Sequence, residues 1–107
     1  MEKEIIVAAS GYFDPLHVGH LEYLEMAKGL GNKLVVIVNN DRQAIQRKGR
    51  PFMSAAERMK ILKALKFVDE VFESIDEDHT VGESLKKISP HVFANGGDMS
   101  IENIPER

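Results

Sequence analysis

Four short apolar runs, separated by helical segments, constrain the fold of this chain most strongly. The runs cover residues 5–9, 34–38, 68–72 and 92–94. The first two show no apolar–polar alternation, which is typical of strands covered on both faces. More than a dozen residues separate successive runs, which is enough for a crossover helix between parallel strands. The order predicts an α/β, Rossmann-like three-layer sandwich with an open parallel sheet.

The segments between the runs carry helix signals of different strength. Residues 18–30 have apolar side chains at helical spacing, and the tetrapeptides 54–57 and 80–83 have the Ser/Thr-x-x-Glu pattern of a capping box. Residues 42–52 are polar and basic and contain Gly and Pro, so we expect a long loop there, with or without one helical turn. Residues 100–107 look like the approach to another helix, so we expect the chain to lack the usual C-terminal strand and helix of such a sheet.

Length, charge and cysteine content limit the classes of protein. A chain of 107 residues is expected to form a single domain over residues 1–107. Its net charge of -3 argues against a general nucleic-acid binder. The sequence has no cysteine, no signal-peptide core and no membrane-spanning apolar run. We therefore expect a cytoplasmic protein with neither nucleic-acid nor membrane partners.

The turn after the first strand, residues 11–20, is the strongest candidate for a site, because ligands bind beyond the carboxyl ends of parallel strands. It has neither the P-loop nor the Gly-x-Gly-x-x-Gly pattern. His17 and His20 are three residues apart, which places both rings on one face of the first helical turn. Two imidazoles beside the N–H groups of a helix start suit a polyphosphate, and Gly19 leaves room for a ligand near the backbone. A metal-binding pair and simple helix capping are the alternatives.

This turn resembles the hallmark of the cytidylyltransferase-like nucleotidyltransferase superfamily, Gly-x-Phe-Asp-x-x-His-x-Gly-His. The matching residues are Gly11, Phe13, Asp14, His17, Gly19 and His20. The resemblance extends over nearly the whole chain. Arg50-Pro51-Phe52, Glu57-Arg58, Val68-Asp69 and Gly96-Gly97-Asp98 look like later landmarks of its glycerol-3-phosphate cytidylyltransferase and heptose-1-phosphate adenylyltransferase branch.

The resemblance implies a reaction. A phosphate oxygen of a phosphorylated sugar or polyol attacks the α-phosphorus of ATP or CTP, and pyrophosphate leaves, with Mg²⁺ as the implied cofactor. The nucleophile is already ionised, so catalysis depends on positioning and charge stabilisation rather than on a general base. Residues 77–98 look closest to the heptose-phosphate type, which favours ATP.

The resemblance also implies roles for particular residues. The implied catalytic residues are His17, His20 and Lys48. The implied nucleotide-binding residues are Gly11, Tyr12, Phe13, Asp14, His17, Gly19, His20, Gly97 and Asp98. The implied acceptor-binding residues are Asp14, Lys48 and Arg58, with Arg47 or Arg50 as substitutes for Lys48. No metal-ligating side chains are predicted, and Val68-Asp69 suggests a homodimer.

Some of these residues have simpler interpretations, and the chain departs from the family pattern. The basic loop can be a solvated surface, and Arg58 can pair with an acid on its own helix. Asn95 stands where the family often has Lys, and the family's later Ser/Thr-rich turn has no counterpart after Asp98. The rival hypotheses are a nucleotide-binding module without catalysis, and a related enzyme that makes FAD, coenzyme A or NAD precursors.

Overall fold

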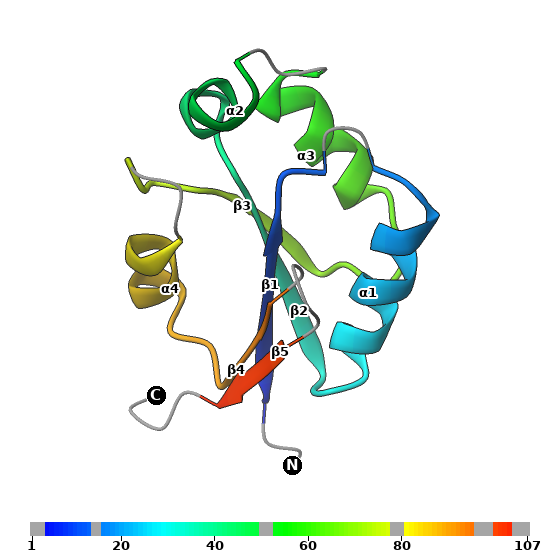
Figure 1. The fold of residues 1–107 in the computed structure, drawn as a ribbon. Helices are drawn as coiled ribbons and strands as arrows, with labels where there is room; N and C mark the ends of the chain where they lie inside the picture. Colours follow the sequence, from blue (N-terminus) through cyan, green and yellow to red (C-terminus); the bar gives the residue numbers. More distant parts are fainter. Residues whose placement is uncertain (1–3, 14–15, 50–52, 78–80, 96–99, 104–107) are drawn as a thin grey trace.

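A five-stranded sheet flanked by helices is the main feature of the computed structural model, which describes residues 4–13, 16–49, 53–77, 81–95 and 100–103. For residues 46–48, 95 and 100–103 only the backbone is described. The elements, drawn in Figure 1, are β1 (Ile6–Gly11), α1 (Val18–Lys28), β2 (Lys33–Val38), α2 (Asp41–Lys48), α3 (Ala55–Lys63), β3 (Glu70–Glu73), α4 (Gly82–Ile88), β4 (Val92–Asn95) and β5 (Ser100–Asn103).

The strand order is β3-β2-β1-β4-β5, in which the first four strands are parallel and β5 is antiparallel to β4. The chain first adds strands on one side of β1 and then crosses to the other side. The switch point of the sheet, where ligands bind in folds of this type, therefore lies between β1 and β4. The predicted open parallel sheet is confirmed, with β5 added at one edge.

Helices cover both faces of the sheet (Figure 1). Alternate β1 residues point to opposite faces, so Val7 and Ala9 join the cluster with α1 and α3, while Ala8 packs with Phe93 and with the apolar side of α4. The near-continuous apolar character of β1 and β2 follows from this double burial. The three-layer sandwich predicted from the sequence is confirmed.

Two predictions about local structure are wrong. Residues 41–48 form α2 instead of a loop, because Asn40 and Gln43 make a reciprocal capping box at its start, each side chain accepting the other's backbone N–H at 2.8 Å. Residues 100–103 form β5, paired with β4, instead of leading into a helix. The first segment lacks the apolar helical spacing on which the sequence analysis relied, and the second gains its strand structure from pairing with β4.

The two predicted capping boxes differ in outcome. The box of Ser54 and Glu57 is present at the start of α3 and is confirmed. The box predicted at residues 80–83 is wrong, because the N-cap of α4 is Val81, which makes no side-chain cap; Thr80 lies outside the described residues. The carboxylate of Asp76 instead accepts the backbone N–H groups of Glu83 at 2.7 Å and Ser84 at 3.0 Å.

Asp69, expected from the resemblance to lie at a dimer contact, has partners within the chain. Its carboxylate accepts the backbone N–H of Leu34 at 2.7 Å and pairs with the ammonium of Lys28 at 2.5 Å. Burial acts to raise the pKa of Asp69, but the hydrogen bonds from Lys28 and Leu34 hold that pKa below its ordinary value. Asp69 therefore joins α1 to the start of β2.

Within the described part of the chain, the helices are too short or too polar to span a bilayer.

Candidate active site

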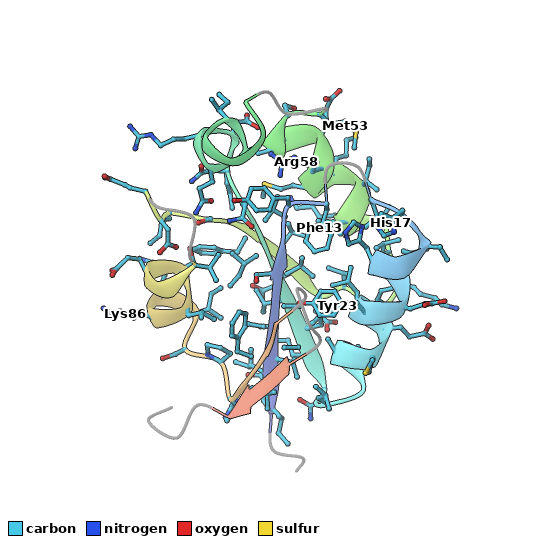
Figure 2. All side chains as sticks on the ribbon, in the orientation of Figure 1. Phe13, His17, Tyr23, Met53, Arg58 and Lys86 are labelled. Atoms are coloured by element: carbon cyan, nitrogen blue, oxygen red, sulfur yellow. The ribbon has the colours of Figure 1, made fainter. Side chains whose placement is uncertain are left out.

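The carboxyl ends of β1 and β2 and the start of α1 meet at one end of the sheet. Figure 2 shows Phe13 and His17 at this end, with Arg58 nearby on α3. Gly11 ends β1, and its carbonyl accepts the backbone N–H of Asn39 just beyond β2, at 3.0 Å. The turn that carries the predicted phosphate-binding residues is thereby joined to the neighbouring strand end.

His17 and His20 begin α1 as a capping box built from two histidines. Nδ1 of His17, the N-cap, accepts the backbone N–H of Gly19 at 3.0 Å. Nδ1 of His20 accepts the backbone N–H of His17 at the same distance. The rings satisfy two backbone donors that a helix start otherwise leaves without partners. The capping role considered from the sequence is therefore present.

Capping fixes the tautomer of both imidazoles. A nitrogen that accepts a hydrogen bond carries no proton, so in each neutral ring the proton resides on Nε2. Nε2 is then the hydrogen-bond donor of each ring, as a phosphate-binding role requires. Capping and phosphate binding use different nitrogens of His17 and His20, so one role does not exclude the other.

Aromatic packing holds the two imidazoles in place. The ring centroids of His17 and His20 are 3.9 Å apart, and the rings of Phe13 and His20 form a T-shaped pair with centroids 5.0 Å apart. Phe13 is buried and adopts a φ of 52°, in the left-handed region that non-glycine residues rarely occupy. A non-glycine residue with such a φ has a strained backbone, and strain of this kind is found where the surrounding structure fixes a functional turn.

Gly19 is required by the neighbouring imidazole. A Cβ at this position would lie 2.9 Å from Cε1 of His17, closer than a carbon–carbon contact allows. A side chain at residue 19 would therefore displace the His17 ring from its capping position. This packing reason for glycine supplements the ligand-approach reason inferred from the sequence.

Arg58, an implied acceptor-binding residue, is 1% exposed and bonded within the protein. Its guanidinium donates to the backbone carbonyls of Tyr12 at 2.7 Å and Asn39 at 2.8 Å. It also donates to the carbonyl of Met53 at 3.1 Å and the carboxylate of Asp41 at 3.0 Å. Arg58 thus ties the turn after β1 to the end of β2 and to the starts of α2 and α3. The structure gives it a positioning role.

The other implied site residues divide into two groups. Gly11, Tyr12, Phe13, Gly19 and the two histidines lie together in the first turn, and Tyr12 contributes its carbonyl to Arg58. Asp14, Gly97 and Asp98 lie outside the described residues. Lys48 ends α2, but its side chain is outside the described part, as is that of Arg47.

A protein-only metal cage is not found within the described ranges. No group of three or more His, Cys, Asp or Glu side chains that could hold a metal ion occurs in them. Mg²⁺ is commonly held by substrate phosphates and one or two carboxylates rather than by a complete protein cage.

Tyr23 is a residue that the sequence analysis passed over. Its side chain is 5% exposed, and its hydroxyl contacts both Ser10 at the end of β1 and Ala94 in β4. Burial raises the pKa of Tyr23 to about 12, against a smaller lowering by its backbone hydrogen bond with Ser10. A tyrosine one helical turn after His20 was the only sequence signal for this contact.

The fold and the site define the class of this protein: a Rossmann-like domain in which two capping histidines begin the helix after the first strand. Residues 8–106 match the model of the cytidylyltransferase-like family. The chain belongs to this family of nucleotidyltransferases.

The relatives of this chain include FAD synthases and bifunctional HldE proteins. The FAD synthase of Thermococcus sibiricus is 46% identical over 103 residues, which cover 94% of this chain and 68% of that protein. The bifunctional protein HldE of Blochmanniella floridana is 44% identical over 94% of this chain but only 21% of its own length. A crystal structure of a lipopolysaccharide core biosynthesis protein from Thermoplasma volcanium superposes with a TM-score of 0.78 at 32% identity, covering 85% of this chain and 73% of that one.

Proposed function

We propose that this chain transfers a nucleoside monophosphate from ATP or CTP to the phosphate of a small molecule and releases pyrophosphate. A phosphate oxygen of the acceptor forms a bond to the α-phosphorus, and the bond from that phosphorus to the β-phosphate oxygen breaks. Mg²⁺ enters with the triphosphate as part of the substrate. The chemistry needs no protein nucleophile, so the protein's task is to align the two phosphates and stabilise charge.

The observation that carries the proposal is the capped histidine pair at the start of α1. Each ring presents Nε2 as a donor because Nδ1 of His17 and Nδ1 of His20 accept backbone N–H groups. Donors that are fixed before the substrate arrives stabilise developing charge without reorganisation. In the proposed reaction these two donors contact oxygens of the triphosphate, while Lys48 contacts the acceptor phosphate.

ATP is the favoured donor, and two acceptor classes deserve the first tests. FAD contains an adenylyl group joined to the phosphate of FMN, so the FAD synthase relatives point to ATP and FMN. The lipopolysaccharide biosynthesis neighbour and the resemblance at residues 77–98 favour a sugar phosphate instead. Both acceptors present a phosphate monoester to the same site.

A product assay separates these possibilities. The purified chain is incubated with Mg²⁺, ATP or CTP, and one of FMN, a sugar phosphate or glycerol 3-phosphate, and both pyrophosphate release and product mass are measured. We expect one acceptor to give a dinucleotide, a nucleotide sugar or a nucleotide-linked glycerol, with stoichiometric pyrophosphate. Nucleotide binding without pyrophosphate from any acceptor would support the rival binding module.

We also propose that the protein is a cytoplasmic homodimer. The support is the resemblance at Val68-Asp69 for the dimer, and the lack of cysteine for a reducing compartment. Light scattering coupled to size exclusion tests the dimer: a single species near the monomer mass of 12.0 kDa would contradict it.

A further inference from the structure

Asn39 is a polar residue that is buried at the carboxyl end of β2. Its backbone N–H donates to the carbonyl of Gly11 at 3.0 Å, and its backbone carbonyl accepts from Arg58 at 2.8 Å. The first bond places Asn39 beside the turn after β1, and α2 begins two residues later, at Asp41. Figure 1 shows α2 directly beyond this end of β2. Asn39 therefore lies between the turn that leads to the histidines and the helix that ends at Lys48.

The side-chain amide of Asn39 has no hydrogen-bond partner among the described residues, although Asn39 is only 4% exposed. The next residue differs, because the Asn40 amide donates to the carbonyls of Ser74 and Asp76 and its oxygen caps α2. A hydrogen-bonding group this deeply buried normally has a partner, since losing its contact with water costs free energy. The Asn39 amide is not completely enclosed, so a small group can still reach it.

The chemistry of an amide limits what that group can be. An asparagine side chain has a carbonyl oxygen that accepts hydrogen bonds and an NH2 group that donates them, and it carries no charge. A hydroxyl matches it, because a hydroxyl both donates and accepts, whereas an ionised phosphate only accepts and an ammonium only donates. A hydroxyl is also small enough for the narrow opening that an exposure of 4% leaves.

We infer that Asn39 is a specificity-determining residue for the acceptor: its amide binds a hydroxyl on the carbon next to the one that bears the acceptor phosphate. This inference rests on the proposed function, which brings the acceptor phosphate between the histidine turn and α2, where Asn39 lies. The hydroxyl nearest that phosphate is therefore the one that reaches the amide.

The inference narrows the class of acceptor. FMN, sugar 1-phosphates and glycerol 3-phosphate all carry a hydroxyl on the carbon next to the phosphate-bearing one. Phosphopantetheine and nicotinamide mononucleotide, which are precursors of coenzyme A and NAD, carry none there. The Asn39 amide thus favours a polyol or sugar phosphate over the acceptors of the coenzyme A and NAD alternatives.

The test combines matched acceptors with a variant of Asn39. Glycerol 3-phosphate is paired with the monophosphate of 1,3-propanediol, glucose 1-phosphate with its 2-deoxy form, and FMN with an FMN that lacks the ribityl hydroxyl nearest the phosphate. The value of kcat/KM for pyrophosphate release with Mg²⁺ and ATP or CTP is measured for the original chain and for Asn39→Ala. In the pair that the original chain uses, we expect it to prefer the hydroxylated member by about tenfold or more. Asn39→Ala should prefer that member by less than about threefold.

Ile37→Val is the matched control. Ile37 lies two residues earlier on β2, is fully buried and has no polar group in its side chain, so its replacement loosens packing without removing a hydrogen bond. We expect Ile37→Val to keep the preference of the original chain. Thermal unfolding and the KM for the nucleotide are measured alongside, and in Asn39→Ala that KM should change by less than about twofold.

Failure of this inference and failure of the proposed function give different results. If the original chain releases no pyrophosphate with any acceptor, the proposed function fails, and the role of Asn39 fails with it. If the original chain uses both members of a pair equally, the inference alone is wrong, and this result needs no variant. A preference that survives in Asn39→Ala also overturns it, because another group then recognises the hydroxyl. A preference lost in Asn39→Ala and kept in Ile37→Val supports it.

Discussion

The imidazoles of His17 and His20 pack against each other with their centroids 3.9 Å apart and their planes tilted by 32°, and each ring uses Nδ1 to accept a backbone N–H of the same helical turn. The pair therefore forms one rigid unit whose orientation is set by the backbone of α1. Rigidity of this kind is what an electrostatic contribution to catalysis requires, because donors that are already oriented cost no reorganisation during the reaction.

His17→Asn separates the two roles of this residue. Asparagine is a favoured N-cap, and its side-chain oxygen takes the place of Nδ1, but nothing replaces Nε2. We expect the stability of the variant to stay within about 0.5 kcal/mol of the original, while kcat falls by about 10²-fold or more. Urea unfolding and pyrophosphate release measure the two quantities. His17→Ala should lose the same activity and about 1 kcal/mol of stability as well. Full activity in His17→Asn would show that Nε2 has no part in catalysis.

The fold was predictable where the sequence signal is local and apolar. The apolar runs at residues 5–9 and 34–38 became β1 and β2, because a strand buried on both faces consists almost entirely of apolar residues. The weaker run at residues 68–72 became β3, which covers Glu70–Glu73 and is only partly buried. α2 was missed because its polar residues show no apolar stripe, although Asn40 and Gln43 carry its start signal. β5 is four residues long and gains its structure from pairing with β4, which no local pattern reveals.

In the candidate site, too, local features were predictable from the sequence and long-range contacts were not. The relation of His17 to His20 follows from helical spacing alone, so the sequence placed both rings correctly on one face. The contacts of Tyr23 with Ala94 and of Arg58 with Tyr12 join residues 71 and 46 positions apart. Such long-range contacts depend on the assembled sheet. A sequence without an alignment therefore identifies the turn but not the side chains that hold it.

Arg58→Lys tests whether this residue positions the turn or contacts the acceptor. A lysine ammonium cannot reproduce the planar set of bonds to Tyr12, Asn39 and Asp41, so buried carbonyls lose their donors. We expect a loss of about 2–4 kcal/mol in the free energy of unfolding, measured with urea.

The control for Arg58→Lys is Arg42→Lys, because Arg42 is exposed on α2 and its replacement should change stability by less than about 0.5 kcal/mol. A positioning role predicts that the KM values for nucleotide and acceptor rise together in Arg58→Lys. A rise in the acceptor KM alone, with stability unchanged, would instead restore the direct acceptor contact implied by the family resemblance.

Asp76→Asn tests the buried network that starts α4. Burial acts to raise the pKa of the Asp76 carboxyl, but hydrogen bonds from Ser84, Glu83 and Ser74 hold that pKa below its ordinary value. A carboxyl with a lowered pKa stabilises the fold above the pKa of the unfolded chain, and this stabilisation is lost as the pH falls through the folded value. We expect Asp76→Asn to lose about 1–3 kcal/mol at pH 7 and less near pH 3. Glu77→Gln, at an exposed neighbour, should leave the unfolding curves unchanged at both pH values, and an equal loss for Asp76→Asn at both would contradict the ionised network.

The alkaline titration of Tyr23 gives a prediction with the opposite sign. Burial raises the pKa of Tyr23 from 10.0 to about 12, so between these values the unfolded chain has released a proton that the folded chain retains. Stability contributed by the protonated hydroxyl is therefore complete below pH 10 and falls as the pH rises towards 12. The chain has two tyrosines, Tyr12 and Tyr23, so comparing the tyrosinate absorbance of the original chain with that of Tyr23→Phe isolates the contribution of Tyr23. We expect Tyr23→Phe to remove the component that titrates near pH 12 and to flatten the loss of stability in that range. If the variant keeps that component, the component does not come from Tyr23, and the hydrogen bond to Ala94 does not retain the proton of Tyr23 in this pH range.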